Sequence, residues 1–262
     1  MDRPHLTAAA RPNEVWTADF KGWFRTGDGT RVDPLTVRDL ASRYALAVDL
    51  LERQDVQNCR PAFEKIFRQY GLPTVIRVDN GSPFGAVGAL GLTRLSAWWV
   101  RLGIKVEFIT PGHPEQNGSH EQFHRVYKAE ALQPPAWSLR GQKGRSERWR
   151  QHYNQERPHE ALHMRVPSDI YRKSRRRMPK KLPHWKYDPE WQTRLVKGKG
   201  MISLEGQGRF VGEAFEGHRI GLRSSRAGVR EVHFGPLLIG ELWDNETTGI
   251  RAAWYRKGTK RR

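Results

Sequence analysis

The stretch Lys105–Glu130 constrains the fold most strongly, because it changes from a strand pattern to a helix pattern at one point. Apolar and polar side chains alternate from Lys105 to Thr110, and a Pro-Gly-His-Pro segment then ends the strand and starts a helix. The expected apolar face of that helix consists of Phe123, Val126, Tyr127 and Ala131. The opposite, outward face is expected to carry Glu121, His124, Arg125 and Lys128. A carboxylate beside basic groups on an outward face suits a metal ion and a phosphate chain.

Two more carboxylates stand at the ends of predicted strands. The β-branched run Thr74–Gly81 ends on Asp79 and an Asn-Gly turn, and the strand candidate Glu14–Lys21 has Asp19 near its end. A single outward Glu on an amphipathic helix is usually only solvated. Two strands that each supply an Asp, followed by a helix that supplies a Glu, instead indicate a site with oxygen ligands.

Four motifs follow one another in a fixed order: N-E-V-W-T-A-D-F-K-G, V-D-N-G-S-P-F, P-G-H-P-E-Q-N-G-S-H-E and Y-N-Q-E-R-P-H-E-A-L. With these motifs the sequence resembles the insertion-sequence transposases of the integrase superfamily, from about Pro12 to Tyr171. The resemblance implies a ribonuclease-H-like core with a catalytic, metal-binding Asp, Asp, Glu triad, which falls on Asp19, Asp79 and Glu121. In that family the last motif closes the core against the catalytic helix, which implies a structural role for Tyr153, Asn154, Arg157, Pro158 and His159.

The implied reaction is cleavage of DNA phosphodiester bonds and strand transfer during transposition. Two Mg²⁺ (or Mn²⁺) ions held by carboxylates can activate the oxygen nucleophile, stabilise the leaving oxygen and neutralise the phosphoryl charge. Lys128 is expected to hold a backbone phosphate, and Arg125 is a weaker candidate. The implied partners are the ends of the element and target DNA, with the protein acting as a homo-oligomer on DNA.

The composition agrees with a DNA-binding protein. The 262 residues carry 46 Lys and Arg against 28 Asp and Glu, a net charge of +18, which is typical of proteins that neutralise phosphates. A ribosome-like or membrane-surface protein would show the same surplus. Ten Trp and a hydrophobic fraction of 37% indicate a packed core. Because no apolar run suits a membrane span or signal peptide, we expect a soluble, cytoplasmic protein.

Three alternatives stay open. The segment His120–His124 reads H-E-x-x-H, the zinc-metallopeptidase signature, although no third ligand is evident and Cys59, the single cysteine, excludes a Cys-rich zinc domain. A catalytically inactive or truncated transposase relic would keep the fold and bind DNA without sequence preference. A ribonuclease-H-type nuclease would cut RNA–DNA hybrids without joining strands.

The predicted fold class is α/β, a ribonuclease-H-like mixed sheet flanked by helices, followed by a small all-β SH3-like barrel. Residues 1–11 are a leader, and residues 12–135 form the integrase catalytic core. The core is expected to begin with three antiparallel strands. A crossover helix then connects the third strand to the strand that ends on Asp79, so this pair of strands is expected to be parallel. A glycine-rich segment, 81–91, is expected to be a mobile loop over the site.

The C-terminal half is divided by composition. Residues 136–190 form a helical closure and a basic linker, residues 191–256 the barrel, with its short strands and glycine turns, and residues 257–262 a basic tail. Five linker residues are expected to contact phosphates, namely Arg172, Lys173, Arg175, Arg176 and Arg177.

The segment ahead of the first strand is short. Only about a dozen residues precede it, too few for the helix-turn-helix region that the resembling family carries there. We therefore expect a truncated reading frame or the downstream part of a split one. Alone, such a chain should bind element-end and random duplexes with similar affinity, and should cut element ends poorly.

Overall fold

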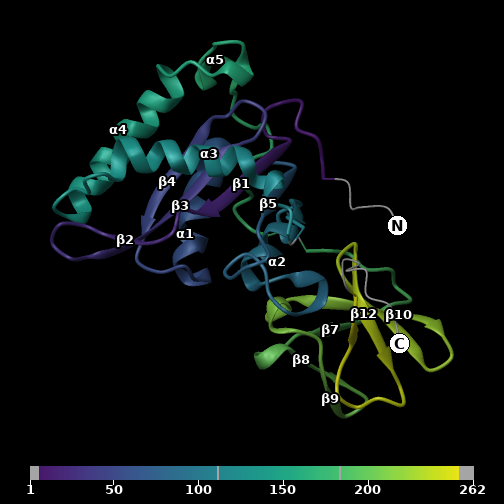
Figure 1. Ribbon diagram of the computed structural model, residues 1–262. Helices are drawn as coiled ribbons and strands as arrows, with labels where there is room; N and C mark the ends of the chain where they lie inside the picture. The colour runs from purple at the N-terminus through teal and green to yellow at the C-terminus, as the bar shows by residue number, and fades with distance from the viewer. Residues whose placement is uncertain (1–5, 111, 183, 254–262) are drawn as a thin grey trace. The chain divides into compact units, whose positions relative to one another are not determined.

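The computed structural model describes residues 6–110, 112–182 and 184–253 (Figure 1). They fall into two compact units, which we call the core unit (residues 1–83 with 102–180) and the C-terminal unit (residues 84–101 with 181–262). The sequence-based division placed residues 84–101 in the catalytic core, whereas they pack in the C-terminal unit. The other predicted boundaries stay predictions, and the basic tail lies outside the described residues.

The core unit is built on a six-stranded mixed sheet in the order β2-β3-β1-β5-β6, with β4 on β3. The strands are β1 (Val15–Phe20), β2 (Phe24–Arg25), β3 (Arg31–Asp39), β4 (Ala45–Leu51), β5 (Val75–Val78) and β6 (Lys105–Phe108). The pairs of β3 with β1, β2 and β4 are antiparallel, and β5 lies parallel to both β1 and β6. The predicted antiparallel start is therefore confirmed. The expected parallel pairing of the third strand with the strand after the crossover helix is wrong, because β4 pairs with β3 and β5 pairs in parallel with β1 and β6.

The crossover helix is α1 (Val56–Tyr70). It begins where the Asp55 side chain accepts a hydrogen bond of 2.8 Å from the Asn58 N–H, and it ends at Gly71, whose φ of 81° favours glycine. A Cβ at Gly71 would lie 2.7 Å from the Ser174 carbonyl oxygen, so glycine also admits the returning chain. The buried face of α1, with Phe63, Ile66 and Phe67, packs against the sheet.

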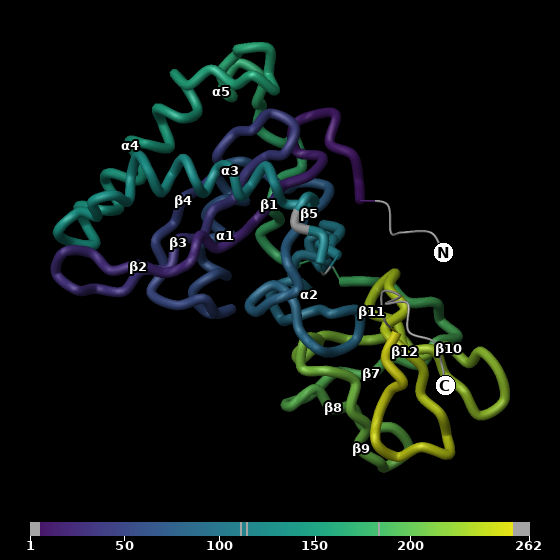
Figure 2. Tube along the Cα trace, viewed as in Figure 1, coloured from purple at the N-terminus to yellow at the C-terminus, as the bar shows by residue number. Residues whose placement is uncertain are grey.

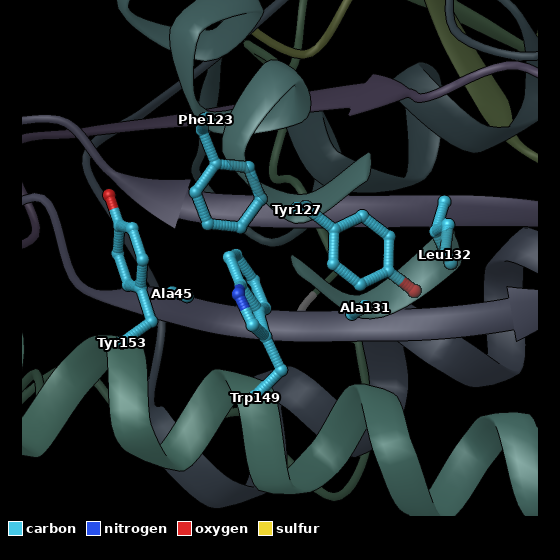
Figure 3. Close-up of a cluster of buried hydrophobic side chains, with 7 residues drawn as sticks. All are labelled: Ala45, Phe123, Tyr127, Ala131, Leu132, Trp149 and Tyr153. Carbon is cyan, nitrogen blue, oxygen red and sulfur yellow. The ribbon is translucent and has the colours of Figure 1, made fainter. Parts of the chain in front are cut away.

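Helices from the second half of the core unit share one apolar cluster (Figure 3). They are α3 (Gly118–Tyr127), the π-helix η3 (Lys128–Leu132) and α4 (Leu139–Gln155), with the 3-10 turn η2 (Pro114–Asn117) ahead of α3 and η4 (Glu160–Leu162) and α5 (Pro167–Ile170) after α4. Trp149 of α4 packs against Phe123 and Tyr127 of α3, with ring centroids 5.2 and 4.8 Å apart. Ala45 of β4 completes the cluster, so α3 is held between α4 and the sheet.

The Y-N-Q-E-R-P-H segment ties these helices to the sheet. The Asn154 side chain accepts from the Ala45 N–H at 2.8 Å and donates to the Ala45 carbonyl at 2.9 Å. Arg157 pairs with Glu130 at 2.7 Å. These interactions agree with the structural role that the sequence implied for the motif.

The C-terminal unit is mostly β-structure (Figure 1), and Figure 2 shows the course of its chain. A five-stranded sheet has the order β13-β12-β11-β10-β7, and β8 pairs with β9 in a hairpin. Its strands are β7 (Gln192–Leu195), β8 (Met201–Leu204), β9 (Gln207–Phe210), β10 (Arg219–Arg226), β11 (Val229–Phe234), β12 (Leu237–Trp243) and β13 (Arg251–Ala252). The Ile250 N–H donates to the Phe210 carbonyl at 2.9 Å and links the hairpin to the larger sheet. The predicted all-β fold that follows the core is confirmed.

Short helices complete this unit, and one of them lies in the glycine-rich segment that was expected to be a mobile loop. They are η1 (Ala89–Gly91), α2 (Arg94–Arg101), η5 (Gly198–Gly200) and η6 (Glu213–Phe215). Ala89 and Leu90 are buried, and the Leu90 N–H donates to the Ala253 carbonyl at 2.9 Å. The end of the segment is therefore packed, whereas Val87 near its centre is 96% exposed. Among the described helices, none has the length and hydropathy needed to cross a membrane.

Candidate active site

Asp19 and Asp79 reach the same edge of the core sheet. Strands β1 and β5 are parallel and pair Thr17 with Arg77, so the two aspartates each stand two positions beyond that pair. Side chains at equivalent positions of neighbouring parallel strands point to the same face. Asp19 accepts hydrogen bonds from the Phe20 N–H at 2.8 Å and from the Asn117 amide at 2.9 Å. Asp79 accepts from the Gly81 backbone.

The third carboxylate, Glu121, is exposed in the first turn of α3. It lies close enough to affect Asp19. Burial raises the pKa of Asp19 to about 6, the Asn117 hydrogen bond opposes that shift, and the charges of Asp79 and Glu121 add to it. Burial also raises the pKa of Asp79. The structure therefore brings the three predicted residues into one electrostatic cluster from three separate elements.

The chemistry of this donor set fits a divalent cation. Hard cations prefer carboxylate oxygens, and a cation would offset the burial and the smaller repulsion from Asp79 and Glu121 that disfavour ionised Asp19. In the described ranges, no Lys, Arg or His lies within ion-pair distance of Asp19, Asp79 or Glu121. Nor does the described part of the chain contain three or more His, Cys, Asp or Glu side chains arranged at ligating distances. The three carboxylates thus lie near one another, but within the described residues they do not lie at the distances at which they would bind one ion together.

The histidines of the H-E-x-x-H segment point into the core unit, which corrects the outward position predicted for His124. His120 is completely buried and His124 is 8% exposed. Their Nε2 atoms lie 2.6 and 2.7 Å from the hydroxyl of Thr36 on β3. Glu121 lies between them in sequence but faces outward, so the segment does not form the zinc site of a metallopeptidase.

The hydrogen bonds around Thr36 fix the protonation of both rings. The Thr36 hydroxyl donates its one proton to the Asp19 carbonyl at 3.0 Å, so it can only accept from the histidines. Both Nε2 atoms must therefore carry hydrogen, and His120 Nδ1 accepts from the Thr17 hydroxyl at 2.9 Å. Burial lowers the pKa of His120 well below its usual value and that of His124 to about 3. Neutral histidines thus join the Glu121 helix to the strand that carries Asp19.

The basic residues predicted on α3 are exposed, and the structure adds one that sequence reasoning missed. Lys128 and Arg125 are both exposed. Burial lowers the pKa of Lys21, the charge of Lys128 lowers it further, and the charge of Asp19 opposes the shift. Lys21 therefore lies near both Asp19 and Lys128. Its place two residues after Asp19 was the available signal, and Asn117 was likewise visible just ahead of the helix.

Some arginines of the basic linker form hydrogen bonds to backbone carbonyls of the core unit. Arg176 donates to the carbonyls of Gly103, at 2.7 Å, and of Pro73. Arg172 donates to the Tyr171 carbonyl at 2.8 Å. Lys173, Arg175 and Arg177 are exposed, with Lys173 5.9 Å from the ring centroid of Tyr70. The linker thus packs along the core unit, and its binding of phosphates stays a prediction.

Comparison with protein families agrees with this architecture. Residues 9–114 and 102–167 match two models described as "Integrase core domain", and residues 191–250 match "IS481 family transposase, C-terminal domain". A protein from the simian T-cell lymphotropic virus intasome, solved with a PP2A regulatory subunit, shares the fold. Its TM-score is 0.54 at 14% identity, covering 88% of this chain and 76% of that one. The fold and the matched domains define a protein of the integrase-core class.

Sequence relatives narrow the class. A 31.7 kDa protein of insertion element IS407 from Burkholderia multivorans is 30% identical over 178 residues, which are 67% of this chain and 61% of that protein. A 39.2 kDa protein of IS476 from Xanthomonas euvesicatoria is 32% identical over 168 residues, 60% of this chain and 44% of that protein. The chain belongs to the insertion-sequence transposases with an integrase core domain. It spans about half the length of these relatives.

Proposed function

We propose that this chain catalyses metal-dependent cleavage of DNA phosphodiester bonds and strand transfer during transposition. The observation that carries the proposal is the convergence of Asp19, Asp79 and Glu121 from β1, the end of β5 and α3. Three carboxylates without cationic partners among the described residues, in a chain of net charge +18, suit a metal-assisted reaction on a polyanion.

Asp19, Asp79 and Glu121 would hold two Mg²⁺ (or Mn²⁺) ions. Such ions, when bound, activate the attacking oxygen and stabilise both the leaving oxygen and the phosphoryl charge. The chain itself orients the ligands. Asn117 fixes one oxygen of Asp19, and the Thr36–histidine bonds hold the backbone of Asp19 against α3. Without metal, Asp19 binds a proton below about pH 6, because its pKa is about 6.

Positive charge lies beside the triad for the DNA backbone. Lys128, with Lys21 next to it, would hold a phosphate near Asp19, and exposed Arg125 extends the positive surface of α3. The proposed ligands are the ends of the element and target DNA, bound by a homo-oligomer that forms on DNA.

Cleavage of end-labelled DNA with Mg²⁺ or Mn²⁺ tests this function. Asp19→Asn, Asp79→Asn and Glu121→Gln should each abolish cleavage and leave DNA affinity largely unchanged, since each removes a metal-binding charge without removing a packing group. Glu115→Gln, an exposed carboxylate in the preceding turn, is the matched control and should cleave normally. Normal cleavage by Glu121→Gln would contradict the assignment.

A DNA-binding protein without strand transfer is the second candidate. The same assay separates the candidates, because a non-catalytic protein would bind DNA and leave every strand intact at all metal concentrations.

A further inference from the structure

A cavity of about 250 Å³ lies in the core unit between α3 and the chain that follows α4. Its polar lining includes Arg38 of β3, Arg43 of the following turn, and Ser119 and Gln122 of α3. Arg157 and His159 of the R-P-H segment complete it. We call this cavity the arginine pocket. None of the roles proposed above uses it.

Arg38 is a buried cation that is affected by the charge of neighbouring Asp39 but forms no salt bridge in the described part of the chain. Its side chain is 3% exposed, its Nη1 donates to the Ser119 carbonyl at 2.5 Å, and its guanidinium lies 4.7 Å from the ring centroid of Phe123. Across the described ranges, no carboxylate lies within ion-pair distance of Arg38, and its Nε has no hydrogen-bond partner. An unpaired buried charge is costly to keep, which is a reason to expect an anion that completes it.

The other groups of the pocket point to the same ligand chemistry. His159 Nε2 is buried and has no partner among the described residues, and Arg43 adds a second guanidinium. Arg157 contributes less, because Glu130 already neutralises it at 2.7 Å. Glu160 is the acidic residue in the lining, and it is exposed. Guanidinium groups with free donors suit phosphate oxygens, which can accept two parallel hydrogen bonds.

The pocket adjoins the triad on two elements. Ser119 and Gln122 lie in the same turn of α3 as Glu121, and β3 pairs Arg38 with Thr17 and Thr36 with Asp19. A DNA strand whose reacting phosphate is at the triad would therefore bring a nearby phosphate to this pocket. We infer that the arginine pocket binds a backbone phosphate of the DNA beside the cleavage site, an inference that rests on the proposed function.

The salt dependence of DNA affinity tests the inference directly. Arg43→Gln should flatten the slope of log K against log salt by ~0.9, because one phosphate is then no longer neutralised. Arg53→Gln, which removes the same charge from an exposed turn outside the pocket, should leave the slope unchanged. The full chain is titrated with a random-sequence duplex in EDTA, so that cleavage does not interfere.

Arg38→Met distinguishes a ligand site from a structural arginine. Because it removes an unpaired buried charge and preserves much of the volume, its Tm without DNA should equal or exceed that of the wild type. DNA should raise the wild-type Tm more than the variant Tm. A lower Tm in the variant, together with unchanged DNA affinity in both Arg38→Met and Arg43→Gln, would show a purely structural role and overturn the inference.

Two further measurements distinguish a DNA phosphate from a free phosphate ion and separate the pocket from the catalytic function. If inorganic phosphate raises the wild-type Tm but Arg43→Gln leaves the DNA salt slope unchanged, the pocket binds a free anion and the assignment to DNA is wrong. Glu121→Gln should lose cleavage and keep the wild-type slope. If the proposed catalytic function is wrong, the slope measurement still tests the arginine pocket. If Arg43→Gln does not change the slope, the proposal for the triad is unaffected.

Discussion

Arg38 and Arg77 are both buried arginines on the core sheet, yet their surroundings differ. Arg77 on β5 pairs with Glu107 of β6 at 3.1 Å and donates to the Thr7 carbonyl at 2.7 Å. Glu107 also accepts from Lys105 at 2.9 Å and from the Thr7 N–H at 3.1 Å. Arg38 lines the arginine pocket, whereas Arg77 contacts the carboxylate of Glu107. A buried charged side chain can therefore stabilise the fold or bind a ligand, and the groups that it contacts distinguish the two roles.

Removing the carboxylate from the paired arginine should have the largest effect. Glu107→Gln should lower the free energy of unfolding by about 3–5 kcal/mol, because it leaves Arg77 buried and uncompensated. Urea denaturation measures this. The double variant Arg77→Met/Glu107→Leu should recover most of the loss. An effect of Glu107→Gln below about 1 kcal/mol is typical of exposed salt bridges and would contradict the contrast drawn between Arg77 and Arg38.

The buried histidines should give the next largest effect. His124→Ala should destabilise the protein by about 1–3 kcal/mol, because it removes one of the buried hydrogen bonds of Thr36 and leaves a cavity where the His124 ring lies beside Phe123. His124→Gln, which can still donate to Thr36, should lose less. Equal stability of wild type and His124→Ala in urea would instead support the tolerance expected of an outward histidine.

The same histidine makes stability depend on pH. Its pKa falls from about 6.5 when unfolded to about 3 when folded, so its contribution is complete above pH 6.5 and is lost as the pH falls toward 3. The urea midpoint of the wild type should therefore fall more steeply than that of His124→Gln between pH 6.5 and pH 4. Parallel curves for the two proteins would contradict the low pKa.

Surface cations of the linker should give the smallest effect on the fold. Arg175→Gln/Arg177→Gln should leave Tm unchanged and flatten the DNA salt slope by ~0.9 for each phosphate that is no longer neutralised. Arg176→Gln should instead cost about 1 kcal/mol of stability, because Arg176 holds backbone carbonyls. If all three substitutions left the slope unchanged, the linker would be a passive spacer.

The sequence could predict the candidate oxygen ligands because their positions depend on local patterns, whereas the fold class and the assignment of the triad came from the family resemblance. The strands ending near Asp19 and Asp79 are short β-branched runs closed by turns, and the Pro-Gly break ahead of Glu121 marks the helix start. These are properties of the chain within a few residues. The ordered motifs then implied how the three segments converge.

Other features depend on partners far away in the chain. At about 100° per residue, His124 lies roughly 60° from Glu121 on α3, at the edge of the polar face. Its burial follows from Thr36, which is 88 positions earlier. Strand β3 is buried along nearly its whole length, so no alternation marked Arg38 as special. The packing of residues 84–101 with the C-terminal unit likewise depends on long-range bonds such as that of Leu90 with Ala253.

The central claim is that Asp19, Asp79 and Glu121 form a metal centre, and metal-dependent thermal stability tests it most directly. Because the raised pKa of Asp19 penalises its ionised form above about pH 6, Asp19→Asn should have a higher Tm than the wild type at pH 7.5 without metal. Mn²⁺ at a hundredfold excess over its Kd should stabilise the wild type by about 2.7 kcal/mol. Asp19→Asn should lose this response, whereas Glu115→Gln should keep it. A wild type that does not respond to Mn²⁺ or Mg²⁺, or a variant that responds equally, would contradict the account.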